Sequence, residues 1–130
     1  MMTNEELDAI IKNLSKVKRG VYGNWEFEID RIRFICLTDT NFNRMRIISP
    51  IAELSTINSD QILKCMEANF HTALDTKYAI SNGVVWSVFI HPLKELTQNQ
   101  VIDCISQVYS SVKTFGSSYS SSNLIFPKSE

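Results

Sequence analysis

The chain has 130 residues, of which 44% are hydrophobic and 21% are charged. This length and composition predict one soluble globular domain and exclude wholesale disorder. The 13 basic and 14 acidic side chains leave a net charge of −1, which argues against a general nucleic-acid binder and against a protein that binds anionic membranes.

The cysteines and the apolar stretches bear on metal binding and on the compartment. Cys36, Cys65 and Cys104 lie far apart and form no CxxC pair, so we expect no metal site and no cofactor. An odd number of cysteines in a short chain fits a reducing compartment. The first residues lack the pattern of a signal peptide, and the longest apolar stretch, residues 83–90, is too short to span a bilayer. The sequence predicts a cytoplasmic protein with no membrane partner.

The first segment, residues 3–19, has the pattern of an amphipathic helix. Thr3 and Glu6 have the spacing of a capping box. Apolar side chains then recur at helical spacing, and they are Leu7, Ile10, Ile11, Leu14 and Val17. The basic side chains of residues 16–19 suit the end of a helix, and Gly20 is the predicted stop.

From residue 24 the apolar side chains alternate with polar ones, which predicts strands. Three strands are expected over residues 24–29, 32–38 and 44–49. If turns at 30–31 and 39–40 close the two hairpins, Phe27 lies opposite Phe34, and Phe34 lies opposite Met45. One face of this meander is then apolar, and its members are Trp25, Phe27, Ile29, Ile32, Phe34, Cys36, Met45 and Ile47.

The other face of the meander mixes charged and aliphatic side chains. It carries two glutamates, three arginines and three aliphatic residues, namely Glu26, Glu28, Arg33, Arg44, Arg46, Ile35, Leu37 and Ile48. A patch of three large aliphatic side chains predicts that something covers this face. We interpret the charges as a cross-strand ladder between glutamates and arginines, with an acidic protein partner, or less favourably a nucleic acid, as the alternative.

The second half of the chain adds two helices and a hairpin. A helix is predicted over residues 58–74, and Asn82-Gly83 predicts a hairpin between residues 77–81 and 84–90. Thr97 and Gln100 form another capping box at the start of a long last helix. The predicted order α-β-β-β-α-β-β-α is an α+β fold in which an antiparallel sheet packs against helices. We expect a single domain over residues 1–116 and a Ser-rich C-terminal tail over residues 117–130.

Catalytic motifs are missing from the sequence. Glu67, His71 and Asp75 are spaced along one helix face, but we interpret them as exposed polar residues rather than as a general base or a metal site. His91 is interpreted in the same way, and the cysteines as small core residues. No catalytic residue is predicted.

The stretch over residues 65–108 carries a family resemblance. A helix that ends in Ala68-Asn69-Phe70, a small hairpin, Pro92-Leu93 after a strand, and Leu96-Thr97 before the last helix resemble the class I type III secretion chaperones and the related YbjN-like proteins. The resemblance implies a small, cytoplasmic, bacterial, homodimeric and non-enzymatic protein. It also implies that the protein binds an extended segment of another protein.

Two surfaces are candidates for these interactions. The mixed meander face is the predicted partner-binding surface, formed by Arg33, Ile35, Leu37, Arg44, Arg46 and Ile48. Either this face or the apolar side of the second helix, at Ile62, Met66 and Phe70, would bury about 800 Å² per protomer in a homodimer. The alternative function is a small-molecule sensor or a small enzyme. It would use a pocket between sheet and helices with His71 or His91 as its polar group.

Overall fold

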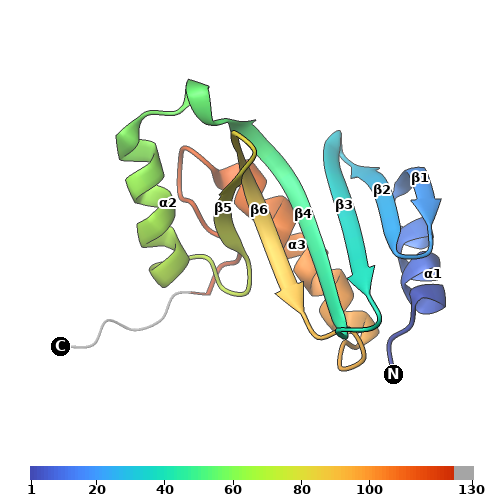
Figure 1. The fold of residues 1–130 in the computed structure, drawn as a ribbon. Coiled ribbons are helices and arrows are strands. Elements are labelled where there is room, and N and C mark those ends of the chain that lie inside the picture. Colours follow the sequence, from blue (N-terminus) through green and yellow to red (C-terminus); the bar gives the residue numbers. More distant parts are fainter. Residues whose placement is uncertain (125–130) are drawn as a thin grey trace.

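Within residues 1–124, the part of the chain that the computed structural model describes, six strands form one antiparallel sheet and three helices pack against it (Figure 1). The order along the sheet is β1-β2-β3-β4-β6-β5. The strands are β1 Lys16–Val21, β2 Asn24–Ile29, β3 Ile32–Asp39, β4 Arg44–Glu53, β5 Lys77–Ser81 and β6 Val84–His91. The helices are α1 Asn4–Leu14, α2 Ser59–His71 and α3 Gln98–Thr114, with a short 3-10 turn at Leu54–Thr56. The predicted α+β class is confirmed.

The first strand, β1, was not predicted. Helix α1 ends at Leu14, and the following residues pair with β2 instead of continuing the helix past residue 15. Val17 lies opposite Phe27 and packs against the core from the strand, so its burial does not require a helix. Gly20 is not a helix stop, because it lies opposite Trp25 in the sheet, where a Cβ atom would come within 3.1 Å of the Trp25 side chain.

The register between strands is partly as predicted. Phe27 lies opposite Phe34, as expected for a two-residue turn at 30–31. Between β3 and β4 the predicted register is wrong, since Met45 lies opposite Thr38 rather than Phe34. The turn is longer than two residues because the Asp39 carboxylate accepts the backbone N–H of Phe42 at 3.0 Å. A shift of four residues is even, so every residue of β4 keeps its predicted face.

The core lies between one face of the sheet and helices α1 and α3 (Figure 1). The apolar meander face is confirmed there: Ile29 and Ile32 are half-buried, and the other six are buried, namely Trp25, Phe27, Phe34, Cys36, Met45 and Ile47. The Phe27 and Phe34 rings stack with centroids 5.2 Å apart. The Trp25 indole N–H donates to Asp8 of α1 at 2.9 Å.

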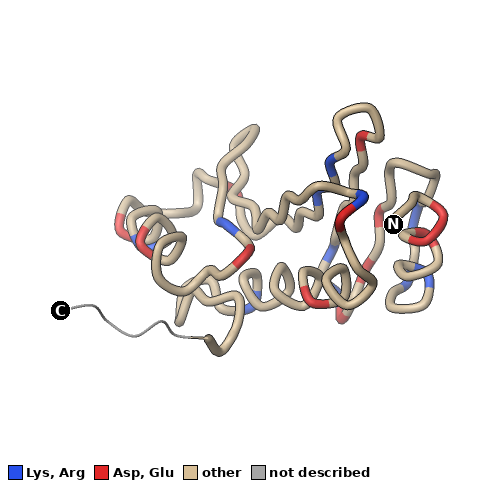
Figure 2. Tube along the Cα trace, turned by 90° about the horizontal axis from the view of Figure 1, so that it is seen from below, with Lys and Arg blue, Asp and Glu red and all other residues tan. Residues whose placement is uncertain are grey.

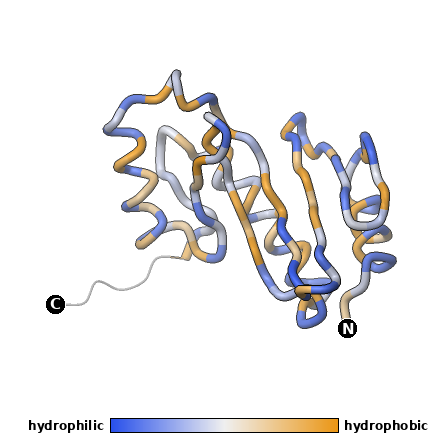
Figure 3. The backbone as a smooth tube through the Cα atoms, in the orientation of Figure 1, coloured by the Kyte–Doolittle hydropathy of each residue, from blue (hydrophilic) through white to orange (hydrophobic). Residues whose placement is uncertain are grey.

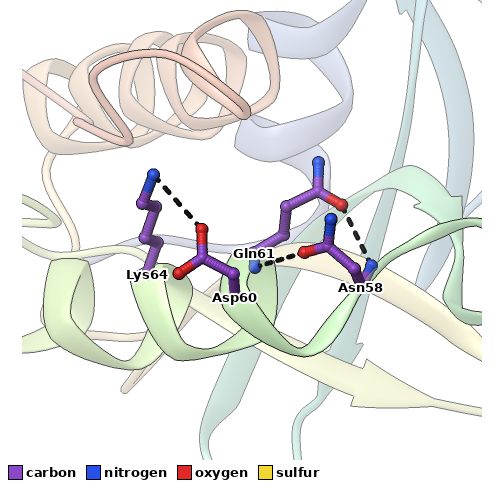
Figure 4. Close-up of polar contacts among 4 residues, drawn as sticks. All are labelled: Asn58, Asp60, Gln61 and Lys64. Carbon is purple, nitrogen blue, oxygen red and sulfur yellow. Dashed lines mark hydrogen bonds and ion pairs between the residues drawn. The ribbon is translucent and has the colours of Figure 1, made fainter.

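Helix α2 packs beside the edge strand β5 rather than over the sheet (Figure 1). It begins at a capping box in which Asn58 accepts the N–H of Gln61 and the Gln61 side chain accepts the N–H of Asn58 (Figure 4). The Asn69 side chain bonds both backbone groups of Tyr78 in β5, accepting at 2.8 Å and donating at 3.1 Å. One side-chain amide therefore ties α2 to the strand edge, next to the buried contact of Cys65 and Ala68 with Tyr78.

The start of the Ser-rich segment packs onto this corner of the molecule. Tyr119 and Ser121 are buried, and the Ser121 hydroxyl accepts the N–H of Leu74 at 2.7 Å. The chain reverses at Gly116, whose φ of +87° is in the left-handed region. Residues 125–130 of the predicted tail lie outside the described residues.

Replacing Asn69 with Ala should lower the free energy of unfolding by about 1–3 kcal/mol, because the part-buried backbone groups of Tyr78 lose their partner. Urea denaturation followed by circular dichroism measures the effect. Asn13→Ala is the matched control, since Asn13 is an exposed residue of α1 and should change stability by less than about 0.5 kcal/mol. Equal stabilities of the two variants would contradict the role given to Asn69.

The buried thiol of Cys36 makes stability depend on alkaline pH. Burial raises the pKa of Cys36 to about 12, and burial also raises the pKa of Tyr78 to about 12. Because the folded-state values lie above those of the unfolded chain, this stabilisation is complete below about pH 8.5 and is lost as the pH rises. The thermal midpoint should therefore fall between about pH 9 and pH 12, and less steeply in Cys36→Ala. A midpoint that stays constant across this range would disprove the prediction.

Candidate functional site

The face of the sheet opposite α3 carries no helix within residues 1–124, and we call it the outer face (Figure 2). The strand registers place aliphatic side chains of three neighbouring strands in rows across it. Ile35, Ile48 and Val88 form one row. Leu37, Arg46 and Ile90 form the next. All six predicted partner-binding residues lie on this face.

Strand β6 contributes side chains to the outer face that the sequence analysis missed. The run 84–90 is apolar on both faces, and it was interpreted as a strand covered on both sides. In the structure Phe89 is buried in the core between the sheet and α3, and Val85 is also buried, whereas Ile90 is 53% exposed on the outer face. The hydrophobic positions along β3, β4 and β6 are visible in Figure 3. The apolar run was visible in the sequence, but the inference that both faces of this strand are covered was wrong for the outer face.

A pocket of about 340 Å³ lies on the outer face beside the turn between β3 and β4. Its apolar lining comes from Leu37, Met45, Ile90 and the 77% exposed ring of Phe42. Arg44 and Arg46 also line it, together with Asp39 and Thr38. The pocket therefore combines an apolar floor with two guanidinium groups.

The predicted ladder between glutamates and arginines does not form. The ion pairs within residues 1–124 join Lys12 to Asp8, Lys18 to Glu28 and Lys64 to Asp60, so none involves an arginine of the outer face. Glu28 is paired at 3.7 Å with a lysine of β1, the strand that the sequence analysis missed. The arginines are consequently available to an external anion.

Helix α2 exposes large apolar side chains and buries small ones. Its buried residues are Cys65 and Ala68, whereas Met66 is 65% and Phe70 84% exposed. Leu63, which was not among the predicted interface residues, is also exposed, and Ile62 is half-buried. The apolar positions recurring along α2 can be followed in Figure 3.

The two histidines do not share one site. His71 is exposed at the end of α2 beside the Phe70 ring. His91 lines a different pocket of about 400 Å³ between the sheet and α3, together with Asp75, Lys77 and Asp103. The Gln107 amide of α3 donates to both aspartates at 2.8 Å. Asp75 lies beyond the end of α2 and is bonded to α3, so it does not share one helix face with Glu67 and His71 as the spacing predicted.

Neither a cluster of metal-ligating side chains nor a membrane-spanning helix occurs in the described part of the chain. Residues 1–124 contain no group of three or more metal-ligating side chains that could hold an ion. No helix among these residues has the length and hydrophobicity to span a bilayer.

No protein-family model and no curated protein matches this chain, but solved structures do. The Yersinia pestis type III secretion chaperone SycH, solved with a stable fragment of YscM2, is 9% identical, with 86% of this chain and 98% of that one covered and a TM-score of 0.65. A chain of the HopA1–SchA chaperone–effector complex is 10% identical, with 86% and 94% covered and a TM-score of 0.64. A chain of the ExsC–ExsE complex is 10% identical, with 88% and 97% covered and a TM-score of 0.61. The similarity to YbjN-like proteins stays a prediction. This chain has the fold of the type III secretion chaperones.

Proposed function

We propose that this chain is a non-enzymatic, chaperone-like protein that binds an extended segment of another protein on its outer face. The observation that supports this most directly is the pair of rows across β3, β4 and β6, in which Ile90 is 53% exposed and Ile35, Leu37 and Ile48 are half-buried. An apolar surface of this kind gains free energy when a partner removes it from water.

The fold adds a second line of support. The similar solved structures include a secretion chaperone bound to a protein fragment and a chaperone–effector complex. Extended segments suit a surface built from parallel rows of side chains, since alternate residues of the segment can enter successive rows. We extend the same proposal to a role in type III secretion and to a cytoplasmic location.

We also propose that two copies associate through α2. Leu63, Met66 and Phe70 form an exposed apolar stripe on the side of the helix away from β5. A two-fold interface would place this stripe against its own copy. Because α2 lies beyond β5 at one end of the sheet (Figure 1), this dimer leaves the outer face of each copy free for a partner.

Light scattering at micromolar concentration should give about twice the 14.9 kDa chain mass. Phe70→Glu should shift the mass to that of the monomer, because a charge would be buried in the interface. Tyr22→Glu is the matched control, since Tyr22 is comparably exposed but lies in the turn after β1, far along the sheet from α2. A wild-type protein with the mass of a monomer would overturn the proposed dimer.

Peptides selected against the wild-type chain from a random display library test the outer face. Ile48→Asp should weaken binding of the selected peptides by at least about tenfold, which corresponds to about 1.4 kcal/mol. Lys113→Asp places the same side chain on α3, on the other side of the molecule, and should leave the affinity unchanged. Circular dichroism checks that both variants are folded. Equal binding by Ile48→Asp and the wild type would locate the site elsewhere.

A further inference from the structure

We infer that the pocket beside the β3–β4 turn anchors the bound segment. One large apolar side chain of the segment enters the pocket, and an acidic residue next to it in the segment pairs with the arginines. This inference rests on the proposed function and specifies the chemistry of the partner. The partner is then a protein segment with an acidic residue beside an aromatic or large aliphatic residue, rather than a basic segment or a nucleic acid.

The apolar half of the pocket is formed by three elements that the register brings together. Leu37 and Ile90 lie on either side of Arg46 in one row of the outer face. Phe42 extends from the turn and is 77% exposed. With a volume of about 340 Å³, the pocket has the size of small ligand sites and admits one large side chain.

The basic half of the pocket consists of one arginine that the turn holds in place and one arginine without a partner in the described part of the chain. The Arg44 guanidinium donates through Nη1 to the Asn43 carbonyl at 2.9 Å and to the Phe42 carbonyl at 3.4 Å. These bonds hold it at the turn and leave its other two nitrogens, Nε and Nη2, for a ligand. The Arg46 side chain has no hydrogen-bond or ion-pair partner within residues 1–124. Two guanidinium groups facing one apolar pocket match a carboxylate beside an apolar side chain.

The acidic groups nearby do not cancel this preference. Asp39 lies opposite Arg44 in the register and also lines the pocket, but its carboxylate is engaged with the N–H of Phe42. The Glu95 carboxylate accepts two bonds from Asn43, at 3.1 and 3.2 Å. Of the residues that line the pocket, two are basic and one is acidic, so the site favours an anionic partner.

Nucleic acid fits this site less well than a protein segment. Binding to a nucleic-acid backbone needs several basic groups in line and aromatic rings on which bases stack. The pocket offers two arginines and one exposed ring. Within residues 1–124, Figure 2 shows acidic positions interspersed with basic ones on helices and strands alike.

The test compares two synthetic peptides that differ only in the residues beside a central Phe. These residues are Asp in the first peptide and Lys in the second. Fluorescence anisotropy measures their binding to the full chain. We expect the Asp peptide to bind about tenfold more tightly at low salt, and this ratio to shrink as added salt shortens the Debye length from about 30 Å to about 3 Å. The double variant Arg44→Glu/Arg46→Glu should reverse the preference.

The matched control is Arg31→Glu/Lys113→Glu, which changes the charge by the same amount and leaves the outer-face residues intact. Arg31 lies in the turn between β2 and β3, at the opposite end of β3 from the pocket, and both residues are exposed. This variant should keep the preference for Asp. A reversal by the control as well would show a long-range effect of net charge and would overturn the pocket as the anchor.

The remaining outcomes separate this inference from the proposed function. If both peptides bind equally and Ile48→Asp abolishes both, the outer face binds protein segments but the acidic anchor is wrong. If neither peptide binds and a random single-stranded oligonucleotide does, in a manner that Arg44→Glu/Arg46→Glu abolishes, both proposals fail. Phe42→Ala should weaken the Asp peptide without changing thermal stability, because the ring is exposed.

Discussion

The burial of a single face of the sheet is the constraint on which the rest of this molecule depends. Both α1 and α3 pack on that face, where the Phe27 and Phe34 rings stack and the Trp25 indole is tied to Asp8. Since alternate residues of a strand point to opposite faces, the residues before and after each inward-facing residue of a strand lie on the outer face. Helix α2 covers neither face of the sheet and lies at the β5 edge instead. Its contact there is made by small side chains, so its large ones point away.

Much of this arrangement follows from local sequence patterns. Alternation from residue 24 gives the inner and outer faces correctly, and the turn at 30–31 sets the β2–β3 register because both of its residues have positive φ. The β1 strand was missed because Val17 fits a helical stripe and a strand equally well. The turn after β3 was misjudged because an Asp39 side-chain bond closes a longer loop than the residue types suggest.

The candidate site could be predicted only in part. The six outer-face residues of β3 and β4 follow from alternation alone, whereas the contribution of Ile90 depends on β6 being the neighbour of β4, a pairing between strands far apart in the chain. The orientation of α2 could not be predicted from the sequence either. Counting apolar positions marks Met66 and Phe70 as a coherent stripe, but only the bond from Asn69 to the edge of β5 shows that this stripe faces outward.

The two hydrogen bonds of Asn69 to Tyr78 affect whether the sheets of two copies can pair edge to edge. Sheets with two free edges tend to polymerise edge to edge. At β5 the outward N–H and C=O of Tyr78 are already occupied by the Asn69 amide, which removes a docking point for a further strand. At the other end, β1 carries Lys16, Lys18 and Arg19, so two copies meeting there would bring like charges together. Both features disfavour edge-to-edge pairing of the sheet with a further copy, so the apolar side chains of the outer face can be exposed without an adjoining edge that invites polymerisation.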